Sequence, residues 1–337
     1  MNAAGLLQMS NGKIKPELLV QVGEEVARVE AELDRQMHSQ VAMVKNVSHH
    51  TLDAGGKRLR PAFVALSAKA TGLPYDEDRS RKIGACMEMI HMATLIHDDV
   101  IDNSPTRRGR DTASAVYGNT GSILAGDVLL AKAMRILAED GDLAIIRTTS
   151  HSVVEMAEGE VRELETRLVF DLDEEAHLEI LRLKTASFIQ CCCEVGAILA
   201  GASEQAQKAL HAYGHHVGMA FQIIDDLLDY RGDKAKTGKA TATDFREGQA
   251  TLPLIYLIDS LTEQESNVAR QKFGSGVTDD EIRMISEWMT SRGAFEKAEA
   301  LAHFHVASAI EALHILPENP ARELLETVAH YVIGREL

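Results

Sequence analysis

Apolar residues recur at every third or fourth position through most of the chain, as over 153–168 and 178–195. This spacing places apolar side chains on one face of an α-helix, whereas a strand alternates with a period of two. No proline lies between Pro105 and Pro253, so this stretch contains no obligatory helix breaker. Aromatic residues make up only 4% of the chain, which favours helices over a β-sandwich or barrel. The pattern predicts an all-α fold with little or no sheet.

Polar and glycine-containing segments interrupt this helical pattern only briefly. The predicted breaks are Thr71–Pro74, Asn103–Thr112, Asp140–Asp142, Asp171–Glu174 and Arg231–Gly248. No low-complexity linker and no change in composition marks a domain boundary. We therefore expect one large domain over residues 1–337, built from roughly ten or more helices. About residues 1–15 are expected to form a flexible N-terminal tail.

Composition limits the cellular compartments and the kinds of binding partner that we expect. The 35 Lys and Arg against 51 Asp and Glu give a net charge of −16, which argues against general nucleic-acid binding. Cys86 and the run Cys191–Cys193 fit neither a zinc-binding CxxC pattern nor a disulfide framework. The chain begins without the features of a signal peptide, and no window approaches the roughly 18 apolar residues of a membrane span. These features predict a soluble, cytoplasmic protein.

Two acidic motifs of the form DDxxD are the strongest chemical signal. Each ends an apolar helical run: Asp98, Asp99 and Asp102 in the first, and Asp225, Asp226 and Asp229 in the second. In a helix, the first and last Asp of each motif share a face. Their charges near a helix C-terminus oppose the helix dipole, and divalent cations with oxygen ligands would compensate them. One such motif is common on solvated faces, but two predict sites for Mg²⁺ ions that also bind a phosphorylated substrate.

Basic residues accompany the first acidic motif. Gly55–Pro61 reads GGKRLRP, in which glycines precede a group of cations that includes Lys57 and Arg60, and Pro61 suits the first turn of a new helix. The spacing of a P-loop is absent. Arg107 and Arg108 follow Asp102 by five and six residues. Because guanidinium groups bind diphosphate oxygens in a bidentate manner, these cations are predicted phosphate partners.

Five further candidates have weaker sequence support. His91 lies two helical turns before Asp98 and is either a phosphate donor or a core histidine. Lys184 and Thr185 lie within a helical run, where a lysine is more often a surface residue. Gln222 lies one turn before the second acidic motif, and Lys239 lies in the loop that follows it.

Taken together, these residues resemble the trans-type isoprenyl diphosphate synthases, the polyprenyl synthetase family. The matching segments run in order along nearly the whole chain: GGKRLRP at 55–61, HMATLIHDDVID at 91–102, RRG at 107–109, EGE at 158–160, KTA at 184–186, FQIIDDLLD at 221–229 and TLPL at 251–254. The resemblance implies helices around a deep central cavity, usually in a homodimer. It also implies Mg²⁺-dependent head-to-tail condensation of isopentenyl diphosphate with an allylic diphosphate, with roughly three ions per active site.

The resemblance assigns roles by position. The metal ligands would be Asp98, Asp102 and Asp225, supported by Asp99, Asp226 and Asp229. The allylic diphosphate would bind Arg107, Lys184 and Lys239, and its developing cation would lie between Thr185 and Gln222. Isopentenyl diphosphate would bind Lys57, Arg60, His91 and Arg108. Many family members carry a second loop lysine where this chain has Gln249, so Lys239 is the only loop lysine assigned.

Small residues before the first acidic motif bear on the length of the product. Short-chain members of the family place aromatic residues four or five positions before the first Asp, where this chain has Thr94 and Ala93. In those members the aromatic residues form the floor of the product cavity, and this chain lacks that floor. Each further helical turn, as at Met89, adds about 5.4 Å to the depth of the cavity. The local pattern resembles the synthases that make quinone side chains, which implies a product of about C35–C50.

Three alternatives remain at this point. A shorter-chain farnesyl or geranylgeranyl diphosphate synthase would use the same chemistry. A non-catalytic subunit that binds prenyl diphosphates would not need to keep both acidic motifs. It would not need to keep Lys57, Arg60, Arg107 and Arg108 either. A class I terpene cyclase would need neither the second DDxxD nor GGKRLRP. We expect the partners to be small-molecule diphosphates and a second copy of the chain, with at most transient membrane contact for product release.

Overall fold

The computed structural model describes residues 16–231 and 241–334, with side chains from residue 27 onward. Within this part of the chain the secondary structure is helical apart from one two-stranded hairpin, so the all-α prediction is confirmed. The chain divides into two compact units. Among the described residues, unit 1 comprises those up to Thr148 with Cys192–Gln207 and Leu316–Leu325, and unit 2 comprises Thr149–Cys191, Lys208–Ile315 and those from Glu326 onward. The single-domain organisation stays a prediction, and the predicted tail lies outside the described residues.

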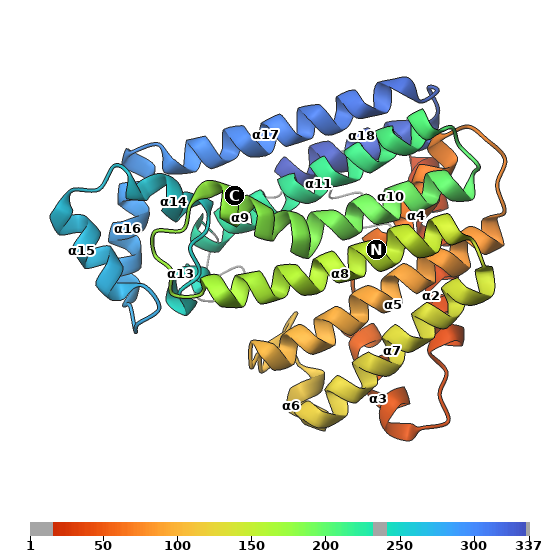
Figure 1. Ribbon diagram of the computed structural model, residues 1–337, viewed down its shortest axis with the longest axis horizontal. Helices are drawn as coiled ribbons and strands as arrows, with labels where there is room; N and C mark the ends of the chain where they lie inside the picture. The colour runs from red at the N-terminus through yellow and green to blue at the C-terminus, as the bar shows by residue number, and fades with distance from the viewer. Residues whose placement is uncertain (1–15, 232–240, 335–337) are drawn as a thin grey trace. The chain divides into compact units, whose positions relative to one another are not determined.

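Unit 1 is organised around one long buried helix. Its helices are α2 (Pro16–Met37), α3 (Ala42–Asp53), α4 (Leu59–Ala70), α5 (Glu77–Ile101), α6 (Ala113–Tyr117) and α7 (Asn119–Asp140). Helix α5 packs against α2, α4 and α7, and it lies beside α7 along much of its length (Figure 1). All eight residues of Ile83–Ile90 are buried, so α5 is covered on every side. Each large aliphatic side chain buried in this way contributes about 1.5–3 kcal/mol.

The acidic residues at the two ends of α5 differ in how they interact with the helix dipole. At the start, Oδ1 of Asp76 accepts a hydrogen bond from the backbone amide of Arg79 at 3.0 Å, and two acidic residues follow in the first turn. Both features suit a helix N-terminus. At the other end the last turn holds acidic residues and no basic one, with Asp102 at the C-cap. The acidic motif therefore lies where the helix dipole is least favourable for it.

The hairpin follows α5 directly. Strand β1 (Thr106–Arg107) pairs antiparallel with β2 (Arg110–Asp111), and Arg107 lies opposite Arg110. The two connecting residues, Arg108 and Gly109, have φ of 54° and 73°. A two-residue hairpin turn of this kind requires positive φ at both positions, which glycine adopts readily and arginine does not. The hairpin therefore holds Arg108 in one backbone conformation after the acidic motif.

Unit 2 contains the remaining elements. They are α9 (Glu174–Leu181), the π-helical turn η1 (Arg182–Ala186), α13 (Thr243–Glu247), α14 (Leu252–Ile258), α15 (Glu263–Lys272), α16 (Asp279–Ser291), α17 (Ala294–Ala312) and the 3₁₀ turn η2 (Leu313–Ile315). Four helices have residues in both units: α8 (Leu143–Thr166), α10 (Ser187–Leu199), α11 (Glu204–Arg231) and α18 (Pro320–Ile333). Helix α13 lies within the predicted break Arg231–Gly248, so that part of the break is helical.

Glycines allow close contact between helices in unit 2. A Cβ atom at Gly159 of α8 would lie 2.7 Å from Cβ of Leu183 and 2.8 Å from the backbone nitrogen of Lys184. A Cβ atom at Gly218 of α11 would lie 2.5 Å from Cα of Ala186. Both contacts involve η1, which is therefore packed against backbone on two sides. π-Helical turns are rare and occur frequently at functional sites.

Part of the apolar stripe that predicts α8 is exposed in unit 2. Its residues Val161 and Leu164 are 55% and 46% exposed, whereas Ser152 and Gly159 are buried. The helix turns its small and polar side towards η1 because only glycine permits that contact. Periodicity alone therefore identifies the helix but not which face the unit buries.

Among the described residues, no helix combines the length and the apolar character that a bilayer crossing requires.

Candidate active site

The first acidic motif occupies the C-terminal end of α5. Asp98 is half-buried, Asp99 is buried and Asp102 is exposed at the C-cap. The backbone amide of Asp102 donates to the carbonyl oxygen of Asp98 at 2.8 Å, so the two residues are one helical turn apart. The predicted placement of these carboxylates on one helical face is confirmed.

An ion pair ties the hairpin to this motif. Nε of Arg107 donates to Oδ1 of Asp99 at 2.7 Å, and the Asp99 side chain is only 8% exposed. Thr112, after the second strand, donates through Oγ1 to the carbonyl oxygen of Ser104 at 2.8 Å. These contacts fix the hairpin, and with it Arg108, beside the end of α5. Asp99 thus has a positioning contact of its own, in keeping with a supporting role.

Arginine side chains gather around the GGKRLRP segment in unit 1. A Cβ atom at Gly56 would lie 2.8 Å from Nη1 of Arg58 and 3.1 Å from Nη1 of Arg108. Two guanidinium groups therefore approach the Gly56 backbone, one from each segment predicted to bind phosphate. Lys57 is exposed at the same turn, and Pro61 lies in the first turn of α4, as predicted. We call Arg58, Arg60, Arg107 and Arg108 the arginine cluster.

The pKa of His91 reflects both its burial and the positive charge of this cluster. Burial lowers the pKa of His91 well below its usual range, and the charges of Arg60, Arg108, Arg107 and Arg58 lower it further. His91 is therefore a neutral imidazole at pH 7, surrounded by cations. The buried Nε of Arg60 has no hydrogen-bond partner among the described residues. A cation whose buried donor is unsatisfied suits an anionic ligand.

Arg58, a residue of the motif to which the sequence assigned no role, anchors the cluster. Its side chain is 4% exposed, and its guanidinium group bonds Glu30 of α2 at 3.1 Å and Glu88 of α5 at 3.2 Å. A third bond, from Nη2 at 2.9 Å, reaches the carbonyl oxygen of Leu52. Arg58 thus connects three helices to the turn before α4. Its partners lie 28 and 30 residues away along the chain, and no local spacing signals them.

The second acidic motif lies at the end of α11 in unit 2. Asp225 is half-buried, and Asp226 is buried. Nε2 of His177 lies 2.8 Å from Oδ2 of Asp226, and the amide of Leu252 donates to the same oxygen at 3.4 Å. His177 is a positioning residue that sequence reasoning missed, because it lies 49 residues from its partner. As in the first motif, the second Asp is the buried and positioned one.

Asp229 holds the chain segment that follows α11. Its two carboxylate oxygens accept the backbone amides of Thr243 and Asp244, each at 3.0 Å. Burial raises the pKa of Asp229, and burial with the charges of Asp229 and Asp226 raises the pKa of Asp244 well above its usual range. Burial and neighbouring carboxylates therefore both disfavour the ionised carboxylates in this part of unit 2. Lys239, predicted to bind the allylic diphosphate, lies outside the described residues.

Lys184 of η1 is ion-paired with two glutamates of α8. Nζ lies 2.9 Å from Oε2 of Glu160 and also contacts Oε2 of Glu163. Burial lowers the pKa of Lys184, but the charges of Glu163 and Glu160 outweigh this and raise it. Glu160 belongs to the EGE segment, and Gly159 of that segment provides the close approach. Thr185 is half-buried on the same turn.

Gln222 lies half-buried on α11 within unit 2, one turn before Asp225. Of the residues predicted to set product length, Met89 and Ala93 are buried at 0% and 2% exposure. Oγ1 of the half-buried Thr94 donates to the carbonyl oxygen of His91 at 2.9 Å. The roles of Gln222, Met89, Ala93 and Thr94 stay predictions.

The arrangement within each unit supports a definite chemistry. In unit 1, carboxylates at the end of α5 adjoin an arginine cluster, which is a combination suited to divalent ions and to phosphate oxygens. In unit 2, half-buried Asp225 belongs to a group of carboxylates whose ionised forms bound cations would stabilise. This chemistry requires no side-chain nucleophile such as the serine of a Ser/His/Asp triad.

Comparison with known proteins identifies the family. The model of the family described as polyprenyl synthetase matches residues 41–289. The octaprenyl diphosphate synthase of Escherichia coli is 35% identical over 313 residues, which cover 93% of this chain and 96% of that protein.

The chain belongs to the polyprenyl synthetase family.

Solved structures of this family have the same fold. A decaprenyl diphosphate synthase from Rhodobacter capsulatus is 35% identical, with a TM-score of 0.89 over 95% of this chain and 98% of that one. A polyprenyl synthase from Caulobacter crescentus, solved with calcium and isoprenyl diphosphate, is also 35% identical, with a TM-score of 0.88 over 94% and 97%. The predicted family and its prenyltransferase class are confirmed, and the chain is similar to enzymes named for long products.

Proposed function

We propose that this polyprenyl synthetase condenses isopentenyl diphosphate head to tail with an allylic diphosphate and makes a long all-trans product. The supporting observation is the arginine cluster beside the first acidic motif of unit 1. Similarity to an octaprenyl and a decaprenyl diphosphate synthase supports a long product, of about C35–C50. Quinone side chains are the use we infer for it.

Divalent ions, proposed as Mg²⁺ and roughly three per active site, would stabilise the negative charge of the leaving diphosphate. Asp98, Asp102 and Asp225 would hold them. Carboxylate oxygens are the donors that Mg²⁺ prefers, and Asp98 and Asp102 are one turn apart on one helical face, so the residues present fit such ions. Asp99, Asp226 and Asp229 would orient the motifs through the contacts described above.

The basic residues divide between the two substrates. Arg60, Arg108, Lys57 and His91 would hold isopentenyl diphosphate, whose C–O bond stays intact. Arg107, Lys184 and Lys239 would bind the allylic diphosphate, whose C–O bond breaks with both electrons leaving on diphosphate. Cations in place before the reaction stabilise that charge without reorganisation.

The allylic cation must meet isopentenyl diphosphate before water. Thr185 and Gln222 are proposed to lie on either side of it, where their polar atoms stabilise positive charge. The double bond of isopentenyl diphosphate supplies the electron pair for the new C–C bond, and loss of a proton then restores a double bond. A site closed to water prevents hydrolysis of the cation.

Small residues at Ala93 and Thr94, with Met89 one turn before, are proposed to leave room for a long tail. Ala93→Phe should shorten the product. Ser80→Ala, on the same helix and remote from the motif, is the matched control and should leave the product length unchanged. An unchanged product in Ala93→Phe would remove Ala93 from this proposal.

We further propose a homodimer in the cytoplasm. The exposed apolar residues of α8 in unit 2, and Ile123 and Leu124 of α7 in unit 1 at 40% and 57% exposure, support a partner surface. The four cysteines are buried free thiols, in keeping with a reducing compartment. Membrane contact would be transient and would serve product release.

The direct experiment combines the purified protein with Mg²⁺, labelled isopentenyl diphosphate and farnesyl diphosphate, and sizes the products by mass spectrometry. We expect a series of products of about C35–C50. We expect no product when Mg²⁺ is left out, and none when one of the two substrates is left out. A C15 or C20 product from a shorter primer would keep the chemistry and contradict the long product. Consumption of the allylic diphosphate alone would indicate a cyclase. No turnover with any primer would favour a binding subunit.

A further inference from the structure

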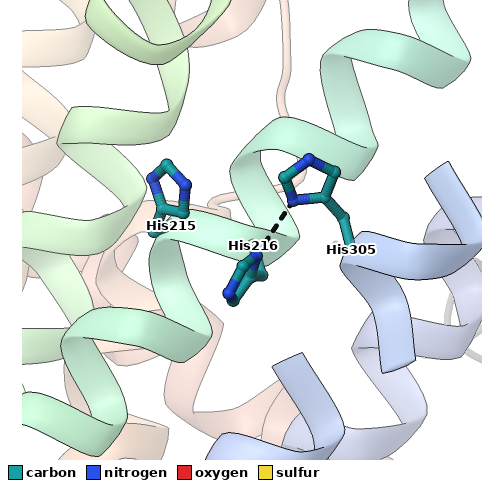
Figure 2. A group of neighbouring side chains, drawn as sticks. All are labelled: His215, His216 and His305. Carbon is teal, nitrogen blue, oxygen red and sulfur yellow. Dashed lines mark hydrogen bonds between the residues drawn. The ribbon is translucent and has the colours of Figure 1, made fainter. Parts of the chain in front are cut away.

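Three histidines of unit 2 form a cluster between α11 and α17 (Figure 2). His215 and His216 are consecutive on α11, and His305 is on α17. One ligand nitrogen from each lies within 4.8 Å of the other two. Nδ1 of His216 and Nδ1 of His305 are joined by a hydrogen bond of 2.9 Å, so these two ring nitrogens point towards each other.

The cluster is separate from the acidic motif on the same helix. His215 precedes Asp225 by ten residues on α11, which corresponds to about 15 Å along a helix. Its donors also differ, because imidazole nitrogen binds transition metals, whereas Mg²⁺ and Ca²⁺ prefer carboxylate and water oxygens. The cluster therefore has no place in the proposed condensation chemistry.

The three rings have the protonation state that metal binding requires. Burial, with the neighbouring His216, lowers the pKa of His215 to about 4. Burial, with His216 and His215, likewise lowers the pKa of His305 to about 4, and burial lowers the pKa of His216. Neutral imidazoles bind a metal without first releasing a proton.

Neighbouring groups limit the freedom of the rings. The ring of Phe304 packs edge to face on His305 at 5.5 Å between centroids and on His216 at 6.5 Å. Arg182, whose charge also lowers the pKa of His215, is compensated by bonds to Glu155 at 2.6 Å and Glu179 at 2.7 Å. Phe304 thus partly fixes the imidazole rings. The charge of the neighbouring Arg182 is compensated by its two glutamates.

We propose that His215, His216 and His305 bind one divalent first-row transition metal ion, best matched by Zn²⁺, with a water molecule as fourth ligand. Zn²⁺ takes imidazole nitrogens at about 2.0–2.1 Å in a tetrahedral arrangement, which places ligand nitrogens about 3.3 Å apart. The observed separations, from 2.9 Å to at most 4.8 Å, bracket that value, so small ring rotations suffice. The ion would join α17 to α11 and stabilise the helix that carries the second acidic motif.

The test measures Zn²⁺ binding to full-length protein that carries no histidine tag. The protein is stripped with a chelator and titrated by competition with a Zn²⁺ indicator, with excess Mg²⁺ present to occupy carboxylate sites. We expect one equivalent of Zn²⁺ and a rise in Tm. We also expect His305→Ala and His216→Ala to weaken binding by at least about 100-fold, beyond the usual effect of removing an outer contact.

His303→Ala is the matched control, because His303 is exposed on the same helix two residues from His305. It should bind Zn²⁺ like the wild type. If the buried His305→Ala variant folds poorly, as judged by circular dichroism, His216→Ala carries the test because His216 is half-buried. Absence of stoichiometric binding, or equal binding in His216→Ala and His303→Ala, would overturn the proposal. Condensation activity is measured separately and decides neither outcome.

Discussion

The two acidic motifs have the same sequence pattern but opposite electrostatic surroundings. In unit 1 the motif adjoins an arginine cluster, whose charges add to burial in lowering the pKa of His91. In unit 2 burial, together with neighbouring carboxylates, raises the pKa of Asp229 and Asp244, and Lys184 is already paired with Glu160 and Glu163. Unit 1 is therefore prepared to bind an anion directly, whereas the motif of unit 2 requires cations first.

The motifs also share a feature that the pattern does not reveal. The second Asp of each, Asp99 and Asp226, is 6% exposed and has a partner from another segment, Arg107 in one unit and His177 in the other. Burial and an ion pair fix these side chains. The outer positions, Asp98, Asp102 and Asp225, are more accessible. Each motif thus contains a positioning residue and at least one proposed metal-binding residue.

The largest effect is expected for loss of an outer carboxylate. Asp98→Asn and Asp225→Asn should each lower kcat by at least about 10³-fold, because each would weaken the stabilisation of charge on the leaving group. Steady-state kinetics at saturating Mg²⁺ would measure this. Asp78→Asn, at the exposed start of α5, is the control and should retain activity. A loss confined to one of the two variants would contradict the proposal that both motifs hold the metal ions.

Removal of the cluster's anchor should affect stability more than chemistry. Arg58→Met should lower the free energy of unfolding by about 3 kcal/mol, because it leaves the buried Glu88 without its partner. Urea unfolding measures this change. Arg81→Met, whose partner Asp78 is exposed, should cost less than about 1 kcal/mol. Equal costs for the two variants would show that Arg58 does not anchor the cluster.

A smaller effect is expected where α8 meets η1 in unit 2. Gly159→Ala should destabilise the protein by about 1–3 kcal/mol, because the added methyl group meets Leu183 and the backbone of Lys184. It should also lower kcat, since the position of Lys184 depends on this contact. Glu158→Ala, at the exposed neighbouring position, should change neither quantity appreciably. Unfolding and kinetics of the two variants at one pH distinguish the outcomes.

The smallest effect concerns pH and tests the lowered pKa of His91 in unit 1. The unfolded chain protonates His91 near pH 6.5, but the folded chain does so only at much lower pH. Acid therefore favours the unfolded state, and His91 contributes stability above pH 6.5 that is lost as the pH falls. His91→Gln should reduce the slope below pH 6.5 by up to about 1.4 kcal/mol per pH unit. An unchanged slope in urea unfolding from pH 7 to 5 would contradict the lowered pKa.

Local sequence predicted the features that depend on neighbouring residues. The helical ends at Asp98–Asp102 and Asp225–Asp229 and the turn before Pro61 are present within their units. The grouping of Arg108 with the GGKRLRP segment came from the family resemblance, and in unit 1 Arg108 does lie beside Gly56. The partners of such residues were not predictable in the same way. Glu88, His177 and Glu163 lie 30, 49 and 21 residues from the side chains that they bond, and chain spacing does not determine such pairs.

The exposed stripe of α8 marks another limit. Val161 and Leu164 continue the apolar period, yet Gly159 turns the opposite side of the helix towards η1. A hydrophobic period predicts a helix with an apolar face, but it does not specify which face the unit buries or against which element. The helix α13 was missed for a related reason, since the amides at its start are held by Asp229, 14 and 15 residues away.

The measurement that tests the comparison most directly is equilibrium binding of isopentenyl diphosphate and of farnesyl diphosphate, each alone, with Mg²⁺ and with a chelator. We expect isopentenyl diphosphate to bind in the presence of the chelator, through the arginine cluster. Arg108→Ala should weaken that binding by about 10- to 100-fold, as loss of a charged hydrogen bond does. Farnesyl diphosphate should require Mg²⁺. Binding of isopentenyl diphosphate that depends on Mg²⁺, or that Arg108→Ala leaves unchanged, would contradict the account.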